Sequence, residues 1–217
     1  MFLGHFALGL AAKKKAPQAS LGTLFLSCQF ADLLWPTLLL LGLEQVAIDP
    51  GNTVVTPLNF ISYPYSHSLV MLAAWSMLLA VIYRLARRST VTAAVTIAAL
   101  VFSHYILDVL THRPDMPITI SGSSRIGLGL WNHRAATVLI ESAMFAAGTF
   151  VYTRSTQARD RVGAIGFWAL VAFLVVIYAG AIFGPPPPDT GSIAIAGHAT
   201  WLLVAWAYWI DRHRVPR

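Results

Sequence analysis

The chain has 217 residues, of which 57% are hydrophobic and only 11% are charged. Soluble domains average about 45–50% apolar and about 25% charged residues, so this composition excludes an ordinary soluble domain and favours a membrane protein. The single cysteine excludes an intramolecular disulfide framework. The net charge of +6 suggests nucleic acid as a partner only until the positions of the basic residues are considered.

Six apolar runs are long enough to cross a bilayer, which takes about 20 predominantly apolar residues. They cover residues 20–43, 67–83, 90–111, 135–153, 162–184 and 192–210. Residues 1–12 form a shorter apolar stretch, followed by three lysines instead of a cleavage site of small residues. This stretch predicts a short helix that enters the membrane from the cytoplasmic face, and not a cleaved signal peptide.

The predicted fold class is all-α, a polytopic membrane helix bundle of about six transmembrane helices plus a short N-terminal half-helix. Six spans leave little chain for a soluble domain, so residues 1–217 are expected to form one integral membrane domain. Residues 1–153 carry the candidate metal site, and residues 154–217 add two transmembrane helices and a basic tail.

The positions of the basic residues along the chain indicate the membrane topology. Twelve of the fifteen fall in four groups that the six predicted spans place on one side of the membrane. These groups are Lys13, Lys14 and Lys15; Arg84, Arg87 and Arg88; Arg154, Arg159 and Arg161; Arg212, Arg214 and Arg217. The opposite loops hold only Arg113, Arg125 and Arg134. The positive-inside rule therefore predicts that both termini are cytoplasmic, and the basicity predicts no nucleic-acid partner.

Three acidic residues, Asp32, Asp108 and Glu141, fall within the apolar runs and have no evident cationic partner in the sequence. An acid at the centre of a bilayer helix costs about 2.5–3.5 kcal/mol on insertion scales, and such residues usually serve function. Nearby histidines favour a bound cation as the compensation. Pro36, one turn after Asp32, is expected to kink the first span and free backbone carbonyls near the acid.

The sharpest pattern is His104, Asp108 and His112, which follow one another at intervals of four residues. On a helix this spacing places all three side chains along one stripe, where neighbouring members can share a metal ion. Zn²⁺ accepts imidazole nitrogen and carboxylate oxygen as ligands. The alternative interpretation is a polar stripe that lines a water-filled cavity or makes interhelical hydrogen bonds.

The predicted topology places several of these groups at a similar depth in the extracytoplasmic half of the membrane. The predicted metal ligands are His5, Asp32, His67, His104, Asp108 and His112. They are expected to hold one or two divalent ions, with Zn²⁺ the first choice. Asp108 and Glu141 are the candidate catalytic residues, and Glu141 acts as general base or orients a ligand histidine. Arg113 is the candidate contact for a phosphate head group.

Other polar residues are weaker candidates. A Ser-His nucleophile at Ser66 and His67 is disfavoured because neighbours in sequence on a helix do not face each other. His133 precedes the fourth span and is expected in the head-group region. His198 stands alone in the sixth span, where a histidine satisfied by hydrogen bonds is the better interpretation.

Several of these motifs resemble the YdjM-like inner-membrane proteins, which are described as predicted metal-dependent hydrolases. The resemblance runs from His5 through the Gln29-Phe-Ala-Asp32 segment, the Ser66-His67-Ser68 segment and the Ser103-His104-x3-Asp108 element, to about Glu141. It implies a bacterial-type inner membrane location. A more distant similarity to zinc-dependent phospholipase C implies a phospholipid or another phosphoester as substrate.

The sequence thus predicts a membrane-embedded hydrolase that acts on a membrane lipid or other amphipathic phosphoester through a metal-activated water. The alternative is a metal-ion or proton transporter or channel that uses the same intramembrane cluster. Inverted repeats typical of secondary transporters are not evident. A third interpretation, a structural subunit, explains three intramembrane acids poorly, because interhelical polar pairs contribute only about 0.6 kcal/mol on average.

Overall fold

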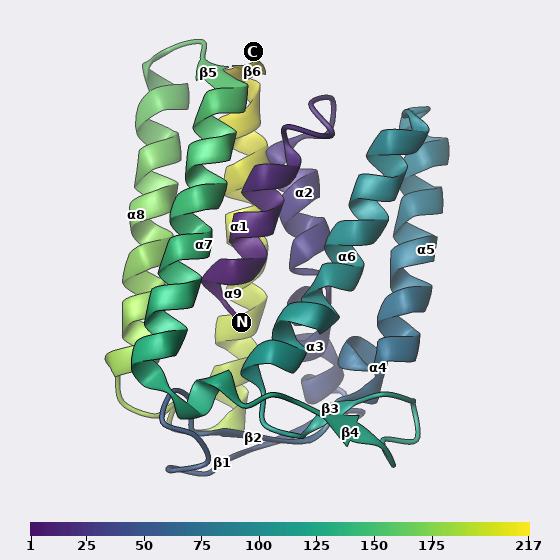
Figure 1. Cartoon of the computed structure of the whole chain (residues 1–217), viewed down its shortest axis with the longest axis vertical. Helices are drawn as coiled ribbons and strands as arrows, with labels where there is room; N and C mark the ends of the chain where they lie inside the picture. Colours follow the sequence, from purple (N-terminus) through teal and green to yellow (C-terminus); the bar gives the residue numbers. More distant parts are fainter.

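Helices make up most of the chain in the computed structural model, which describes residues 1–217 (Figure 1). The nine α-helices are α1 (Leu3–Ala12), α2 (Leu21–Cys28), α3 (Phe30–Leu40), α4 (Pro64–His67), α5 (Leu69–Arg87), α6 (Val91–Thr111), α7 (Arg134–Ser155), α8 (Arg161–Phe183) and α9 (Thr190–Arg212). Three two-stranded antiparallel sheets pair β1 (Gln45–Ile48) with β2 (Leu58–Ser62), β3 (Met116–Pro117) with β4 (Arg125–Ile126), and β5 (Thr156–Ala158) with β6 (Arg214–Pro216). This architecture confirms the predicted all-α class.

Five helices, α5 to α9, are long and apolar enough to cross a membrane, with 19 to 23 residues each. The pair α2 and α3 also qualifies as one span, bent by 58°. With the bent pair counted once, the structure has six candidate spans, as predicted from the sequence. Helix α1 has 10 residues. At 1.5 Å per residue it is about 15 Å long and does not cross.

The first span bends at Gln29, whereas the sequence predicts the kink at Pro36. Gln29 lies between α2 and α3 with φ −105° and ψ 9°, which is not a helical conformation. Pro36 lies inside α3. Helix α9 passes close to this proline, because a Cβ added to Gly197 would lie 2.4 Å from Pro36 Cγ. Close packing against α9 therefore accompanies the continuation of α3 through the proline.

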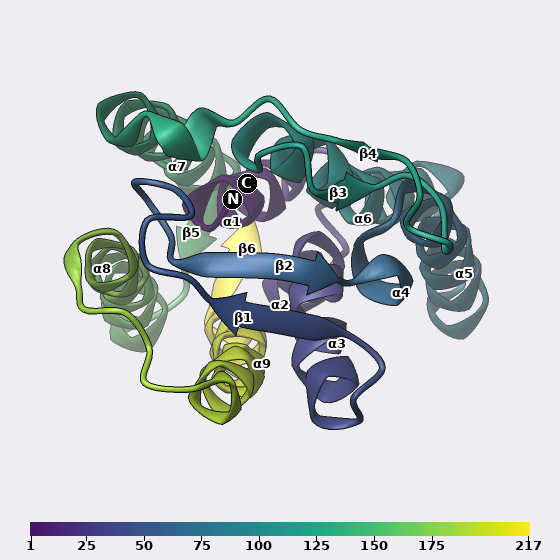
Figure 2. The same cartoon turned by 90° about the horizontal axis from the view of Figure 1, so that it is seen from below.

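The two ends of the bundle differ in structure. The loops after α1, α5 and α7, together with the C-terminal strand, lie at one end, at the top of Figure 1. These segments and the adjoining ends of α5, α7, α8 and α9 carry the twelve grouped basic residues, and we refer to this end as the basic end. The sheets β1–β2 and β3–β4 lie across the opposite end, as Figure 2 shows. The cytoplasmic location of the basic end stays a prediction.

Helix α1 lies inside the bundle, and its N-terminus is near the middle (Figure 1). Phe6 and Leu10 of α1 are fully enclosed by the main apolar cluster. The contact with α7 is close, because a Cβ at Gly148 would lie 2.4 Å from the carbonyl oxygen of Ala7. Glycine at this position therefore lets α1 approach α7 closely enough to carry its side chains into the centre of the bundle.

The α5–α6 hairpin stands apart from the rest of the bundle. Helix α5 packs against α6 and the short α4, whereas α6 contacts α1, α2 and α3. Only 11% of an apolar 18-residue stretch of α5 is buried within the protein. Most of α5 is therefore exposed on the outside of the bundle, and the side chains that the hairpin contributes to the interior come from α6.

Candidate metal centre

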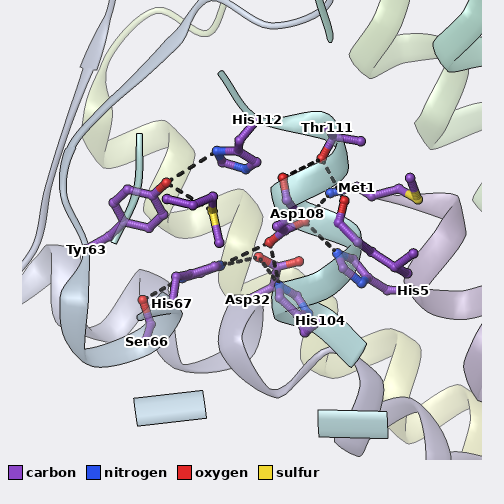
Figure 3. Close-up of polar contacts among 12 residues, drawn as sticks. Met1, His5, Asp32, Tyr63, Ser66, His67, His104, Asp108, Thr111 and His112 are labelled. Carbon is purple, nitrogen blue, oxygen red and sulfur yellow. Dashed lines mark hydrogen bonds and ion pairs between the residues drawn. The ribbon is translucent and has the colours of Figure 1, made fainter. Parts of the chain in front are cut away.

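Five of the six predicted metal ligands converge in the interior of the bundle (Figure 3). His5 comes from α1, Asp32 from α3, His67 from the end of α4, and His104 and Asp108 from α6. They meet because α1 and α3 both pack against α6, and α4 packs against α3. All except Asp32 are buried.

One group of potential ligands consists of His5, His104 and Asp108, whose ligand atoms lie within 4.8 Å of one another. His5 Nε2 is 3.0 Å from Asp108 Oδ1, and His104 Nε2 is 3.1 Å from Asp108 Oδ2. The two imidazole rings stack with their centroids 3.8 Å apart. Each oxygen of the Asp108 carboxylate therefore faces an imidazole nitrogen.

A second group consists of Asp32, His67 and His104, which satisfies the same distance limit. Asp32 Oδ1 lies 3.4 Å from His67 Nε2 and 3.7 Å from His104 Nε2. His67 Nε2 is also 3.9 Å from Asp108 Oδ2. The two groups share His104, so together they form one cluster of three imidazoles and two carboxylates.

The orientation of His104 fits metal binding. Its Nδ1 lies 2.9 Å from the backbone carbonyl oxygen of Cys28. Because a carbonyl only accepts hydrogen bonds, Nδ1 carries a proton, and in the neutral imidazole the lone pair is then on Nε2. This Nε2 is buried and has no hydrogen-bond partner. An unpartnered imidazole nitrogen beside two carboxylates is a donor set that suits a divalent metal such as Zn²⁺.

His67 is oriented by a hydrogen-bond chain that sequence reasoning missed. His67 Nδ1 and Ser66 Oγ are 2.6 Å apart, and Ser66 Oγ donates to Glu44 Oε2 at 2.6 Å. Glu44 Oε1 also accepts the backbone N–H groups of Tyr65 and Ser66, at 2.8 and 2.9 Å. The chain leaves His67 Nε2 facing the cluster. The only sequence signal is an acidic residue directly after the first apolar run.

The contact between Ser66 and His67 corrects the expectation that these neighbours do not meet. Helix α4 has only four residues, and its last side chain turns back onto the preceding one. The Ser66 hydroxyl is fully buried and donates to Glu44, so its proton is not directed at the imidazole. This geometry gives no support to a serine nucleophile.

Glu141 lies beside the cluster at the N-terminal end of α1. Its Oε2 accepts the backbone N–H of Gly4 at 3.4 Å. The amino group of Met1 is buried next to it and lies 2.5 Å from Asp108 Oδ1. Carboxylates are favoured near the partly positive N-terminus of a helix. Glu141 therefore faces α1 rather than a histidine of the cluster.

His112 is the predicted ligand that the structure does not bring into either group. Helix α6 ends at Thr111, and His112 has an extended backbone, with φ −66° and ψ 149°. The stripe expected along α6 therefore stops one residue short. His112 Nδ1 instead lies 2.9 Å from Asp115 Oδ1 and 3.3 Å from the Tyr63 hydroxyl. Its ring packs against Trp131, with centroids 4.3 Å apart.

Tyr63 and Arg113 both contact Asp115. The Tyr63 hydroxyl donates to Asp115 Oδ1 at 3.0 Å. Burial, together with the Asp115 carboxylate, raises the pKa of Tyr63 well above its ordinary value, so the hydroxyl stays protonated at neutral pH. Arg113 donates to Asp115 Oδ2 at 3.3 Å and to Asn59 Oδ1 at 2.6 Å. Its guanidinium is therefore held by the protein and does not line the cavity beside the cluster.

A cavity of about 240 Å³ adjoins the cluster. Asp32, His67, Asp108, His112 and Glu141 contribute its polar lining. Most of the other lining residues are apolar or aromatic, among them Phe2, Trp35, Phe60, Trp131 and Ile182. A polar centre at one wall of an apolar cavity is the arrangement expected for a small-molecule site.

His198, the remaining candidate histidine in a span, has a hydrogen-bond partner at each ring nitrogen, as the sequence predicts. His198 Nδ1 donates to the carbonyl oxygen of Ala194 at 2.8 Å, and its Nε2 is 3.1 Å from Thr37 Oγ1. His133 lies just before α7 and belongs to neither ligand group. These two residues are therefore not part of the cluster of candidate ligands.

Comparisons with protein-family models, with curated proteins and with solved structures found no match. The similarity to YdjM-like proteins therefore stays a prediction that depends on the motifs quoted above. Any function for this chain must be argued from the cluster and the cavity themselves.

Proposed function

We propose that this protein is a membrane-embedded, metal-dependent hydrolase that acts on a phospholipid or another amphipathic phosphoester. The observation that supports it best is the cluster of three imidazoles and two carboxylates at the wall of an apolar cavity. Such a cavity accommodates a substrate with both a polar group and a hydrocarbon part. The cytoplasmic orientation of the basic end and a bacterial-type inner membrane belong to the same proposal.

His5, Asp32, His67, His104 and Asp108 are the residues proposed to hold the metal. Zn²⁺ is the favoured ion, and when bound it polarises a phosphoryl oxygen and lowers the pKa of water toward about 7. The two fixed imidazole tautomers favour tight binding, because a carbonyl holds His104 and the Ser66–Glu44 pair holds His67.

Two further residues are proposed to carry protons during hydrolysis. Glu141 lines the cavity and takes a proton from the attacking water. His112 lines it as well: while Asp115 holds its Nδ1–H, the doubly protonated imidazole carries a second proton on Nε2, which it gives to the leaving oxygen. Arg113 is ion-paired with Asp115, so we propose that it supports this pair and is not the main contact for a substrate phosphate.

The test is elemental analysis of protein purified without chelators, combined with a hydrolysis screen on phospholipids and soluble phosphoesters. Wild-type protein is expected to contain about one zinc ion per chain, and His104→Ala and Asp108→Ala are expected to lose it. The matched control is His198→Ala, which removes a histidine outside the cluster. Wild-type protein without metal would refute the proposal.

A transporter of metal ions or protons is the second candidate, and the bend of the first span favours it. Broken helices near a midplane ion site are common in secondary transporters. The bend between α2 and α3 lies three residues from Asp32. Bound metal without turnover of any phosphoester, together with metal or proton flux in liposomes, would favour this candidate over the hydrolase.

A further inference from the structure

A second cavity, which we call the basic-end crevice, opens at the end of the bundle opposite the β1–β2 sheet. Its volume is about 670 Å³. It lies between α5 and α6 on one side and α2 and α9 on the other, where the α5–α6 hairpin stands apart from the bundle (Figure 1). It shares no lining residue with the central cavity beside the metal cluster.

Two guanidinium groups at the crevice have no partner. Arg87 is the last residue of α5, and Arg212 is the last residue of α9. Both line the crevice, and neither forms a hydrogen bond or an ion pair through its side chain. The acidic lining residue, Asp211, is paired with Lys13 at 2.7 Å. Asp211 therefore leaves both arginines free for an external anion.

The rest of the lining separates into a polar rim and an apolar wall. At the rim, Ser20 Oγ and Thr23 Oγ1 are 2.8 Å apart, and Thr23 Oγ1 is 3.0 Å from the Tyr208 hydroxyl. The apolar wall consists of Leu26, Leu79, Ile82, Ala86 and Ile97. A ligand that suits both parts has an anionic, hydrogen-bonding head and a hydrocarbon tail.

We propose that the basic-end crevice binds an anionic phospholipid of the adjoining leaflet, with its phosphate between Arg87 and Arg212 and one acyl chain along the apolar wall. Charge complementarity selects this occupant, because a zwitterionic lipid gains less from two unpaired guanidiniums at a membrane surface. This site is independent of the proposed hydrolase function and of the metal cluster.

The test is a titration of detergent-purified protein with dioleoylphosphatidylglycerol or dioleoylphosphatidylcholine, followed by native mass spectrometry. Each basic residue near a membrane surface contributes about 1 kcal/mol toward anionic lipid, or about five-fold in affinity. Two arginines are therefore expected to give about thirty-fold preference for phosphatidylglycerol. The double variant Arg87→Gln/Arg212→Gln is expected to lose this preference.

Two matched controls distinguish lipid binding in the crevice from general attraction by surface charge. Arg84→Gln/Arg159→Gln removes the same charge at the same end but outside the crevice lining, and should keep the preference. Ala86→Trp narrows the crevice without a change of charge and should weaken lipid binding, whereas Leu85→Trp outside the lining should not.

Four results would overturn the proposal. The first is equal affinity of wild-type protein for the two lipids. The second is an equal loss of preference in the two double variants, which would indicate surface charge alone. The third is displacement of the lipid by millimolar inorganic phosphate, which would indicate a site for a soluble anion. A lipid that stays bound to Ala86→Trp with unchanged affinity would place it elsewhere on the protein.

Discussion

His104 Nδ1 lies 2.9 Å from the carbonyl oxygen of Cys28, the last residue before the bend in the first span. In a continuous helix this carbonyl would accept the backbone N–H of Asp32, four residues later. The bend leaves it free for the imidazole, so one feature both releases a backbone acceptor and fixes the protonation of a ligand histidine. The broken helix thus forms part of the candidate metal centre.

Substitution of single histidines should separate the ligands from the residues around them. His67→Ala removes an imidazole of the cluster, and we expect the purified protein to lose bound metal. His112→Ala removes an imidazole held by Asp115 and Tyr63, and we expect metal content to be retained. Inductively coupled plasma mass spectrometry measures both. Loss of metal in His112→Ala would restore the ligand role that the four-residue spacing predicts.

The close packing of α1 on α7 should control the position of His5. In Gly148→Ala the new methyl group would lie 2.4 Å from the Ala7 carbonyl oxygen, and backbone atoms cannot move aside without shifting α1. Overpacking of this kind typically costs about 1–3 kcal/mol. We expect a lower melting temperature in detergent and weaker metal binding, both measured on the same preparation.

The control for this substitution is Gly180→Ala in α8, where no atom lies within 4 Å of the added Cβ. Alanine has a helix propensity about 1 kcal/mol better than glycine, so this variant should be as stable as the wild type or slightly more stable. Equal melting temperatures for the two variants would show that the α1–α7 contact does not limit the position of α1.

The number of spans and most of the cluster follow from the sequence, because apolar length and the energetic cost of buried acids are local properties. Asp32, His104 and Asp108 could be identified in this way. The stripe argument fails at His112, because periodicity holds only while the helix lasts and α6 ends at Thr111. A helix end one residue earlier or later is beyond what local sequence signals resolve.

The parts that could not be predicted depend on contacts between distant segments. Glu44 lies at the start of the loop between α3 and α4. It supports His67 only because this loop folds back and places the N-terminus of α4, some twenty residues later, beside Glu44. The bend at Gln29 has no local signal, since the proline that predicts a kink lies at Pro36. Its position is explained instead by bonding to His104 and by the packing of Gly197 on the proline.

Acid should weaken the contact between Asp160 and His213 at the basic end. Asp160 Oδ2 lies 2.7 Å from His213 Nδ1, and Oδ1 accepts the backbone N–H of Gly163 at 2.8 Å. The hydrogen bond from His213, followed by that from Gly163, lowers the pKa of Asp160 below its ordinary value of 3.8. Its contribution to stability is therefore fully present above about pH 4 and is lost as the pH falls through the lowered value.

Asp160→Asn measures this contribution. We expect the variant to unfold at lower denaturant concentration than the wild type at pH 6, and the difference to shrink at lower pH. Asp49→Asn is the matched control, because the Asp49 carboxylate is exposed and accepts no hydrogen bond. A difference between Asp160→Asn and the wild type that stays constant down to pH 3 would mean that the Asp160 contacts do not depend on its charge.

Glu44 and Ser66 should set the affinity of the cluster for metal without contacting the ion. Ser66→Ala removes the hydroxyl that joins His67 Nδ1 to Glu44, and Glu44→Gln replaces the acceptor oxygen of that hydroxyl. Loss of such support for a ligand histidine typically weakens metal binding about 10–100-fold. Competition with a chromophoric chelator measures the affinity.

Ser76→Ala is the control, because its buried hydroxyl bonds only to the carbonyl of Leu72. If Ser66→Ala lowers the melting temperature as Ser76→Ala does but leaves metal affinity unchanged, the hydrogen-bond chain stabilises α4 and does not orient His67.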